Sequence, residues 1–451
     1  MTATTFSVRG QKVLVVGAAR SGVAAALLLA RRGASVTLTD ARQQVPQEDE
    51  LRNAGITLEL GAHHARSFTS SNLIVMSPGV PLNLREVAMA RAAGVAVIGE
   101  LELASRWLRG PIVAITGTKG KSTTTTLVGR MLEASGRRVM VGGNIGYPVS
   151  AQVDASTADT VHVIEASSFQ LESTATFRPW IAALLNFSPD HLDRHADEAE
   201  YAAAKMRIFE NQRADDFAVV NADSVEAIRM TTNVRARMVS YGVQDAAADV
   251  HVGRGFVWQR TSEGDIPLLP LAAVQLHGQH MLSNVVAATT ISHLAGATGA
   301  ALARALDGFR GLEHVMELVA TKDGVRFVND SKATNVDAAA KSIESFDRVV
   351  AIVGGKYKGG DFADLSGPLR AHGRAVVAIG EARTMVRDAL KDTVPVVEAA
   401  TLRDAVRSAF DLAGPGGVVL LAPACSSFDM FADYADRGRQ FKEEVRRLVS
   451  E

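Results

Sequence analysis

The sequence of 451 residues has a single cysteine, Cys425, so no disulfide can form within the chain. One thiol is typical of proteins that work in a reducing compartment. The longest apolar stretches, such as VAAALLLA at 23–30, are far shorter than the roughly 20 residues that span a membrane. The first residues, MTATTFSVRGQK, carry no apolar signal core. Together these absences predict a cytoplasmic protein with no membrane association.

An excess of charge of one sign is also missing. The chain has 48 Lys and Arg against 49 Asp and Glu, which gives a formal net charge of -1. There is therefore no electrostatic basis for nucleic acid or an anionic membrane as the main partner. Hydrophobic residues make up 47% and charged residues 22%, as in soluble globular proteins. The length predicts two or three domains.

Apolar runs alternate with helical patterns along most of the chain. A run at 12–17, a helical pattern at 21–33 and a second run at 34–40 form a βαβ unit, which predicts a parallel sheet. Further buried strands are expected at 73–79, 95–100, 111–117, 161–168, 181–188, 324–331, 348–355, 375–380 and 417–424. We predict an α/β protein with a Rossmann-like N-terminal domain (1–104), a central P-loop ATPase-like domain with a parallel sheet (105–310) and a Rossmann-like C-terminal domain (311–451).

A glycine-rich turn, GTKGKST at 117–123, directly follows the apolar run PIVAIT. Glycines let backbone N–H groups approach phosphate oxygens, Lys121 adds a positive charge, and Ser122 or Thr123 offers a hydroxyl to Mg²⁺. The helix expected at 123–136 places its N-terminus beside the loop. The spacing is shorter than in a GxxxxGK[ST] motif, and the alternative is an ordinary turn. The order of strand, loop and helix favours a nucleotide-binding loop.

Three polar residues follow this loop at positions suited to metal chemistry. Glu165 ends the run VHVI, where a carboxylate beside a phosphate loop is placed to hold Mg²⁺. His191 lies in NFSPDHLDRH and Lys205 in YAAAKMRIFEN. Taken singly, a lone histidine is more often structural and a helical lysine more often a solvated charge.

The combination of motifs gives these residues their meaning. The loop resembles the TGTNGKST loop of the Mur ligases and folylpolyglutamate synthetases. GGNIG, EASSFQLE, N-x-x-x-D-H-x-D and Y-x-x-A-K-x-x-I-F stand in the order and spacing of the Mur ligase family. GLEH, FVNDSKATN, IVGGKYKGGDF and APACSSFDMFADYADRGRQF are similar to its glutamate-adding group. The resemblance covers nearly the whole chain.

The resemblance implies an ATP-dependent ligase that adds D-glutamate to UDP-N-acetylmuramoyl-L-alanine through an acyl phosphate, in the cytoplasmic synthesis of peptidoglycan precursors. ATP and two Mg²⁺ would be the cofactors, and the protein would be a monomer. The N-terminal domain would bind the UDP portion, the central domain ATP, and the C-terminal domain the amino acid. One chain does not decide between D- and L-glutamate; the C-terminal motifs favour D.

The resemblance also implies roles for particular residues. The catalytic set would be Lys121, Glu165, His191 and Lys205, with Ser122, Glu165, His191 and a carbamate on Lys205 as metal ligands. ATP would contact Gly117, Thr118, Lys119, Gly120, Lys121, Ser122, Thr123, Asn284, Asp330 and Lys332. The substrates would contact Arg20, Ser21, Asp40, Arg42, Ser77, Pro78, Gly79, Asn144, Ser167, Thr334, Lys358, Ser427, Phe428 and Tyr434. For Asp40 and Arg42, an ordinary polar strand end is the alternative.

Four positions depart from the family pattern. Lys119 and Met281 each stand where Asn is usual, Val315 replaces an Arg near the ATP phosphates, and Tyr434 replaces Phe. We interpret Lys119 as a candidate substitute for the phosphate-binding Arg that Val315 replaces.

Other functions remain open. A sister Mur ligase, an L-glutamate-adding variant or a folylpolyglutamate synthetase-like ligase would share the loop, although no DNPR-type motif is present. A nicotinamide-dependent dehydrogenase is suggested by GAARSG at 17–22, but Ala19 replaces a fingerprint glycine. A non-catalytic sugar-nucleotide-binding module would leave GTKGKST unexplained.

Overall fold

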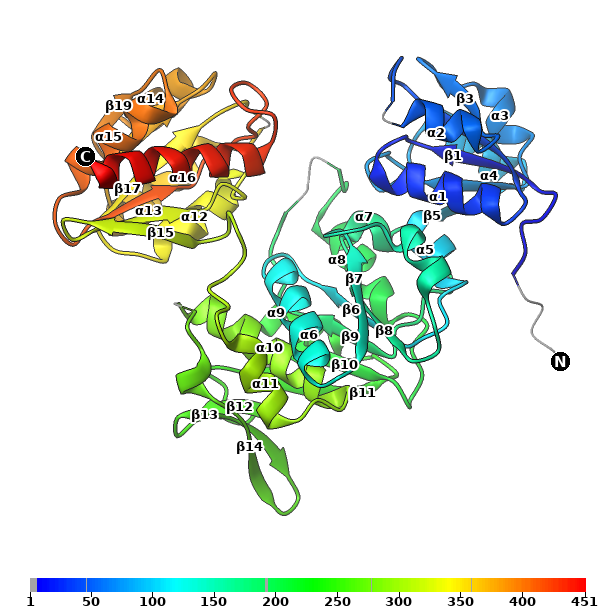
Figure 1. Cartoon of the computed structure of the whole chain (residues 1–451), viewed down its shortest axis with the longest axis horizontal. Helices are drawn as coiled ribbons and strands as arrows, with labels where there is room; N and C mark the ends of the chain where they lie inside the picture. Colours follow the sequence, from blue (N-terminus) through cyan, green and yellow to red (C-terminus); the bar gives the residue numbers. More distant parts are fainter. Residues whose placement is uncertain (1–5, 46, 191–193, 277, 358) are drawn as a thin grey trace. The chain divides into compact units, whose positions relative to one another are not determined.

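The computed structural model describes residues 6–45, 47–190, 194–276, 278–357 and 359–451. The chain divides into two compact units, residues 1–309 and 310–451. Two sheets belong to the first unit and one to the second, so the predicted α/β class with three domains is confirmed (Figure 1). The predicted domain boundaries stay predictions: 104/105 falls inside helix α5, and 310/311 lies one residue past the division between the units.

The first sheet has five parallel strands in the order β3-β2-β1-β4-β5. Its strands are β1 (Lys12–Val16), β2 (Ser35–Asp40), β3 (Thr57–Leu60), β4 (Leu73–Met76) and β5 (Ala96–Gly99). The helices are α1 (Arg20–Arg31), α2 (Glu48–Asn53), α3 (Ala65–Thr69), α4 (Arg85–Ala92) and α5 (Glu100–Ser105). Because β2, β1 and β4 are adjacent and parallel, the loops after them meet at one edge.

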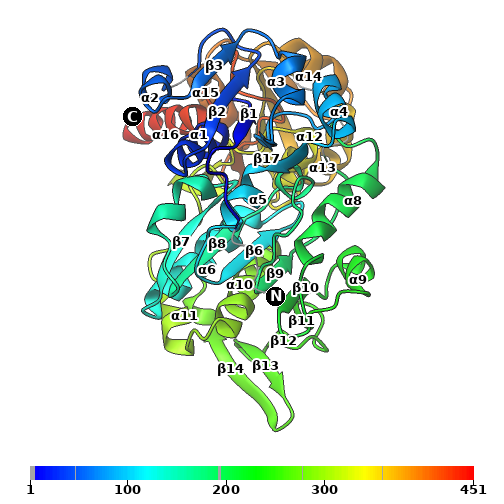
Figure 2. The same cartoon turned by 90° about the vertical axis from the view of Figure 1, so that its right-hand side faces the viewer.

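The second sheet has nine strands in the order β14-β13-β12-β11-β10-β9-β6-β8-β7. They are β6 (Ile112–Thr116), β7 (Arg138–Gly143), β8 (Thr160–Glu165), β9 (Ile181–Leu184), β10 (Phe217–Asn221), β11 (Arg237–Gly242), β12 (Val250–Gly253), β13 (Phe256–Thr261) and β14 (Gly264–Pro270). Only β12–β13 and β13–β14 pair antiparallel, and β13 and β14 extend from the sheet as a hairpin (Figure 2). The helices are α6 (Lys121–Ala134), α7 (Ser168–Leu171), α8 (Glu198–Met206), α9 (Val225–Thr231), α10 (Gln279–Leu294) and α11 (Gly299–Leu306).

The third sheet forms the second unit and has the order β15-β16-β20-β17-β18-β19, with only β15 antiparallel. Its strands are β15 (Glu317–Lys322), β16 (Val325–Asn329), β17 (Val349–Gly354), β18 (Gly373–Ile379), β19 (Val396–Glu398) and β20 (Val418–Leu421). Its helices are α12 (Val336–Glu344), α13 (Ser366–His372), α14 (Arg383–Leu390), α15 (Leu402–Ala413) and α16 (Tyr434–Ser450).

Burial on both faces explains why the central strands are continuous apolar runs. In β17, Val349, Ala351 and Val353 belong to one hydrophobic cluster, and Val350 and Ile352 belong to another. Alternate side chains of a strand point to opposite faces, so every position must be apolar when helices cover both. The predicted strand at 348–355 is β17, and each of the other predicted runs contains a strand.

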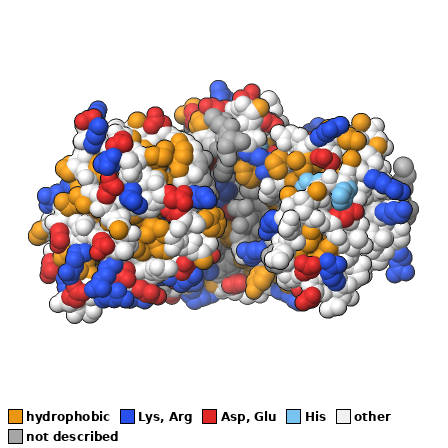
Figure 3. All heavy atoms as spheres, turned by 90° about the horizontal axis from the view of Figure 1, so that it is seen from above, with side chains coloured by type: hydrophobic (Ala, Val, Ile, Leu, Met, Phe, Trp, Pro, Cys, Tyr) orange, Lys and Arg blue, Asp and Glu red, His pale blue; other side chains and the backbone are white. Residues whose placement is uncertain are grey.

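Acidic and basic side chains lie interspersed on the face drawn in Figure 3, in keeping with the near-zero net charge. Among the described residues, no helix is long and apolar enough to cross a membrane.

Candidate nucleotide and substrate sites

The glycine-rich loop links β6 to α6, as the sequence predicts. Gly120 is left-handed, with φ of 82°, and a Cβ there would lie 2.2 Å from Asn284 Oδ1. Only glycine fits this position without displacing the neighbouring side chain. Lys121 Nζ donates to the carbonyl oxygens of Gly117 and Thr118, at 2.9 Å each. The Lys121 side chain therefore bends back over the loop. The first backbone N–H groups of α6 lie beside the same loop.

The side chain of Asn186 braces this loop. Its Oδ1 accepts hydrogen bonds from the backbone N–H of Thr118, at 3.1 Å, and of Lys119, at 2.8 Å. Its Nδ2 donates to the carbonyl of Lys119 at 3.1 Å. Sequence reasoning gave Asn186 no role, although it opens the N-x-x-x-D-H motif. The signal available in the sequence was a polar residue just after a buried apolar run. The structure shows why it matters: that run forms β9, which lies next to β6 in the sheet.

Lys119 extends from the same loop toward an acid. Its Nζ lies 3.6 Å from Asp190 Oδ2; the Lys119 side chain is half-buried and that of Asp190 is largely buried. The ammonium is thus partly balanced by a carboxylate from the loop after β9. Its interpretation as a substitute for the Arg that Val315 replaces stays a hypothesis.

Glu165 is the last residue of β8, and its carboxylate is buried beside β6, the strand that leads into the glycine-rich loop. Oε1 accepts a hydrogen bond from Asn144 Nδ2 at 2.7 Å, whereas Oε2 is buried without a hydrogen-bond partner among the described residues. A buried carboxylate oxygen left unpaired is costly, and a hard cation is a suitable partner. Ser122, half-buried at the start of α6, and Thr123, buried beside it, supply the nearby hydroxyls. The residues present therefore fit Mg²⁺.

Ser167 follows two residues later and caps α7. Its hydroxyl accepts from the N–H of Gln170, and Gln170 Oε1 accepts from the N–H of Ser167. This reciprocal capping box fixes the direction in which the chain leaves Glu165. His191 lies outside the described residues, and the part of the chain that is described contains no cluster of three or more His, Cys, Asp or Glu suited to a metal.

Lys205 is a buried lysine in the last turn of α8. Its side chain is only 1% exposed, its Nζ donates to Gly117 O at 2.8 Å, and it lies 4.4 Å from the ring centroid of Tyr201. Burial holds the pKa of Lys205 well below its usual value, and the Lys121 and Lys119 ammoniums lower it further against the opposing effect of Asp190. The solvated surface lysine that sequence reasoning weighed as an alternative is wrong.

In the first sheet, Asp40 and Arg42 bind each other. Asp40 accepts from Arg42 Nε and Nη2, both at 2.9 Å, and from the Ala18 N–H at 2.6 Å. The hydrogen bond from Arg42 holds the pKa of the Asp40 carboxyl well below its usual range, despite the opposing effect of burial. The pair thereby fixes the GAARSG turn and leaves the outer edge of the Arg42 guanidinium partly exposed.

The loops after β1 and β4 meet at that edge. A Cβ on Gly17 would lie 2.6 Å from Val80 Cγ2 and 2.9 Å from Ser77 Cβ. Arg20, at the start of α1 with half-buried Ser21, donates to the carbonyl of Gly146. Ser77 is buried, whereas Pro78 and Gly79 are increasingly exposed. The structure thus gathers the predicted N-terminal contacts Arg20, Ser21, Asp40, Arg42, Ser77, Pro78 and Gly79 at one edge of this sheet.

Asn284, predicted to lie near the adenine, reaches the glycine-rich loop from α10. Its Oδ1 meets Gly120, and its Nδ2 lies 3.8 Å from Met281 Sδ. Met281 is therefore a direct neighbour of Asn284 one helical turn away, and its thioether is a weaker hydrogen-bond acceptor than the usual amide.

In the second unit, the predicted residues after β16 are held by local contacts. Asp330 accepts from the Met316 N–H at 3.2 Å and from the hydroxyl of Ser342. The backbone N–H of Lys332 donates to His314 O, and that of Thr334 donates to Lys332 O. Both side chains are half-buried.

Three of the remaining predicted contacts lie in the loop after β20 and at the start of α16. Ser427 is buried, and Phe428 and Tyr434 are exposed. Arg437, fully buried, donates to Ser331 Oγ and O and to Cys425 O, which ties this loop to the one after β16. Burial lowers the pKa of Arg437 to about 10. Sequence reasoning missed Arg437 because nothing in the pattern of α16 marks it as buried. Lys358 lies outside the described residues.

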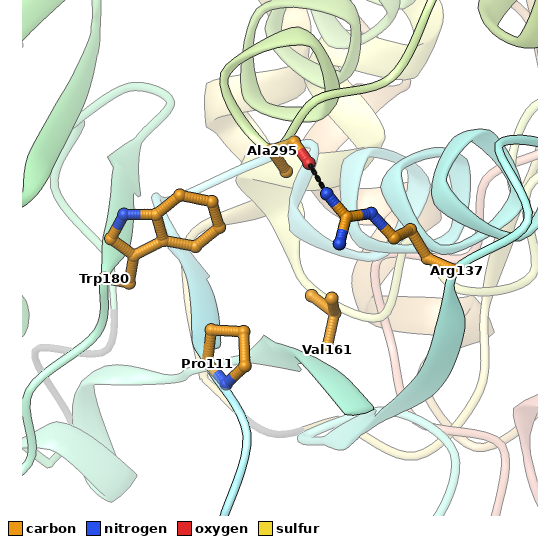
Figure 4. A pocket seen from close by; sticks show the side chains of 5 residues that line it. All are labelled: Pro111, Arg137, Val161, Trp180 and Ala295. Carbon is orange, nitrogen blue, oxygen red and sulfur yellow. Dashed lines mark hydrogen bonds between the residues drawn. The ribbon is translucent and has the colours of Figure 1, made fainter. Parts of the chain in front are cut away.

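A cavity of about 360 Å³ lies at the other edge of the central sheet, lined by Pro111, Arg137, Val161, Trp180 and Ala295 (Figure 4). Pro111 precedes β6 and Val161 is near the start of β8. Because these are the amino ends of strands whose carboxyl ends carry Gly117 and Glu165, the cavity is separate from the candidate nucleotide site.

Comparisons with known proteins agree with this arrangement. Residues 11–99 match the N-terminal domain of MurD-like Mur ligases, 115–292 the Mur ligase middle domain, and 316–425 the Mur ligase glutamate ligase domain. The UDP-N-acetylmuramoylalanine--D-glutamate ligase of Koribacter versatilis is 43% identical over 99% of each chain. That of Acidobacterium capsulatum is 46% identical over 98% of this chain and 97% of its own.

Among solved structures, the pseudomurein peptide ligase type C from Methanothermus fervidus matches with a TM-score of 0.59 at 18% identity, covering 97% of this chain and 100% of its own. MurC from Thermotoga maritima, a UDP-N-acetylmuramate-alanine ligase, gives 0.59 at 19% identity with the same coverage. These distant matches support the fold, and the family follows from the full-length sequence match. The chain belongs to the Mur ligase family.

Proposed function

We propose that this chain is an ATP-dependent ligase that joins D-glutamate to UDP-N-acetylmuramoyl-L-alanine in the synthesis of peptidoglycan precursors. The observation that carries the proposal is the phosphate loop in a chain whose relatives, named for this activity, match it over nearly full length. A dehydrogenase or a simple sugar-nucleotide-binding module leaves both features without explanation. We further propose that the protein works as a monomer in the cytoplasm.

The chemistry has two steps. The alanine carboxylate of the muramoyl nucleotide attacks the γ-phosphoryl group of ATP, and the bond to ADP breaks. The glutamate amine then attacks the acyl phosphate, an amide forms, and inorganic phosphate leaves with the amine proton lost to solvent. Phosphorylation is needed because a carboxylate has no good leaving group. Positioning and charge neutralisation supply most of the rate enhancement.

Within this scheme the loop Gly117–Thr123 cradles the phosphates, and Lys121 neutralises charge on the outer ones. Asn284 would contact the adenine, and Asp330 and Lys332 would also contact ATP. Ser122, Glu165 and His191 would hold Mg²⁺, which when bound neutralises phosphate charge. The unpaired Oε2 of Glu165 supports this assignment.

We assign a carbamate to Lys205. A buried amine whose pKa is lowered has a neutral fraction able to add CO₂, with loss of one proton. The product is an anion with two oxygens, the ligand type that Mg²⁺ prefers. A protonated amine has no lone pair and would repel the cation.

We assign the substrate contacts to different domains of the chain. Arg20, Ser21, Asp40, Arg42, Ser77, Pro78 and Gly79 would bind the UDP portion, with Asn144 and Ser167 near the acyl group. Thr334, Lys358, Ser427, Phe428 and Tyr434 would bind glutamate. The proposed domains are 1–104 for UDP, 105–310 for ATP and 311–451 for the amino acid.

Phosphate release from ATP tests the function. The purified chain is given UDP-N-acetylmuramoyl-L-alanine with D-glutamate, L-glutamate, alanine or diaminopimelate in turn. We expect release with D-glutamate and little with the others. Lys121→Ala is the matched control, because it removes a phosphate-neutralising charge from an otherwise intact loop and should reduce turnover by about 10³-fold or more. Equal release with L-glutamate, or turnover without a muramoyl nucleotide, would overturn the proposal.

A further inference from the structure

Arg194 connects two segments that the sequence places far apart. Its side chain is 15% exposed, and its Nη2 donates to Val80 O at 2.9 Å and to Glu172 Oε1 at 3.1 Å, with Pro78 O at 3.4 Å. Pro78 and Val80 belong to the loop after β4, the proposed UDP contact. Glu172 follows α7, seven residues after Glu165. One nitrogen therefore joins the loop after β4 to the segment that carries Glu165 and Ser167.

One further contact fixes the guanidinium in this position. Its Cζ lies 4.7 Å from the ring centroid of Phe169, which is inside α7. Glu172 is itself largely buried: burial raises its pKa, and the charge of Arg194 opposes that rise. Removing Arg194 would leave a poorly solvated carboxylate without its cation and Val80 O without this donor.

We propose that Arg194 is a positioning residue that couples binding at the sugar-nucleotide loop, Ser77–Val80, to the geometry of the segment Glu165–Glu172. The coupling concerns the reaction proposed above and rests on it. When the nucleotide contacts this loop, the shared guanidinium holds the α7 segment, and with it Ser167 and Glu165, in position. Asn144 and Asn186 cannot do this, because among the described residues their side-chain hydrogen bonds stay within the central domain.

Arg207 supplies a matched control. It binds the same segment, with Nε donating to Leu171 O at 3.1 Å and Nη2 to Thr174 O. Among the described residues, Arg207 makes no hydrogen bond to the Ser77–Val80 loop. Arg207→Gln therefore removes an arginine that stabilises the α7 segment and spares the bridge.

Hydrogen exchange tests the bridge without depending on the identity of the substrate. In Arg194→Gln, backbone amides should exchange faster both around 77–82 and around 168–172. In Arg207→Gln, the increase should be confined to the α7 segment. Faster exchange in only one of the two segments of Arg194→Gln, or no change in either, would overturn the coupling.

Kinetics test its functional consequence. Arg194→Gln should raise the KM for the muramoyl nucleotide and lower kcat, reducing kcat/KM by about tenfold or more, while the KM for ATP changes little. Arg194→Lys should restore the charge but little of the activity, because an ammonium cannot reproduce the planar stacking on Phe169. A proportional loss in Arg207→Gln would instead show a purely structural role. If the wild type itself does not turn over, the proposed function fails, and the exchange result still decides the bridge.

Discussion

Lys205 is a buried lysine whose surroundings disfavour its charged form. A lysine that is 1% exposed must be paired or give up its proton, since burying an isolated ammonium is costly. Its described hydrogen-bond acceptor is a neutral carbonyl, Gly117 O, and the nearest cations repel it. The α8 helix therefore places an amine that favours its neutral form beside the glycine-rich loop at 117–123.

Lys205→Ala should be nearly inactive, and a small carboxylic acid such as acetate should restore part of the activity by supplying the missing oxygens. Turnover of the wild type should fall after CO₂ depletion and return with bicarbonate. Because only the neutral amine adds CO₂, and its fraction shrinks as pH falls through the lowered pKa, the bicarbonate requirement should grow toward acidic pH. Full activity of Lys205→Ala at limiting Mg²⁺ would contradict the carbamate role.

At the scale of one element, α5 carries two buried acids with opposite tendencies. Glu100 accepts from the Ser150 N–H at 2.6 Å, and its burial raises its pKa. Burial also acts against ionisation of Glu102, but the N–H of Ala175, the hydroxyl of Thr176 and Arg106 outweigh it and lower its pKa. The same helix therefore contains one carboxyl that favours the protonated form and one that favours the charged form.

The sign of each shift fixes its effect on stability. The raised pKa of Glu100 gives stability below its unfolded value that is lost as pH rises. The lowered pKa of Glu102 gives stability above its unfolded value that is lost as pH falls through the folded pKa. Glu100→Gln should therefore raise the free energy of unfolding at pH 8, and the gain should vanish below pH ~4.

Glu102→Gln should behave in the opposite way, costing about 1–3 kcal/mol at neutral pH, because an amide NH₂ would face donors that now bind a carboxylate. Urea unfolding between acidic and alkaline pH measures both variants, each serving as the other's control. Equal effects of the two substitutions at pH 8 would contradict this account of α5.

Elements were predictable from the sequence where burial is complete. The run at 348–355 is apolar throughout because β17 packs against clusters on both faces, so it could be recognised without knowing its neighbours. The hairpin of β13 and β14 was missed, since residues such as Arg260 and Ile266 are exposed and the pattern is mixed. The GTKGKST loop was found because glycine is required there; the brace by Asn186 was not, because it depends on β9 lying beside β6.

For the whole molecule, the division into two units separates the proposed ATP loop from the proposed glutamate contacts along the chain. Gly117–Thr123 lies in the first unit, and Thr334, Ser427, Phe428 and Tyr434 lie in the second. Within the second unit, Arg437 ties the loop after β20 to the loop after β16. A substitution at Ser427 should therefore weaken binding of the amino acid and leave nucleotide binding in the first unit intact.

Ser427→Ala should raise the KM for glutamate by about tenfold and change the KM for ATP by less than about twofold, because the loss of one hydrogen bond to a charged group costs about 1.5–3 kcal/mol. Ser366→Ala, in the same unit at the start of α13, is the control and should leave both constants unchanged. The measurement is steady-state phosphate release with each substrate varied in turn. A parallel rise in both constants would mean that the substitution disturbs the second unit as a whole, and the assignment of Ser427 to the glutamate site would be wrong.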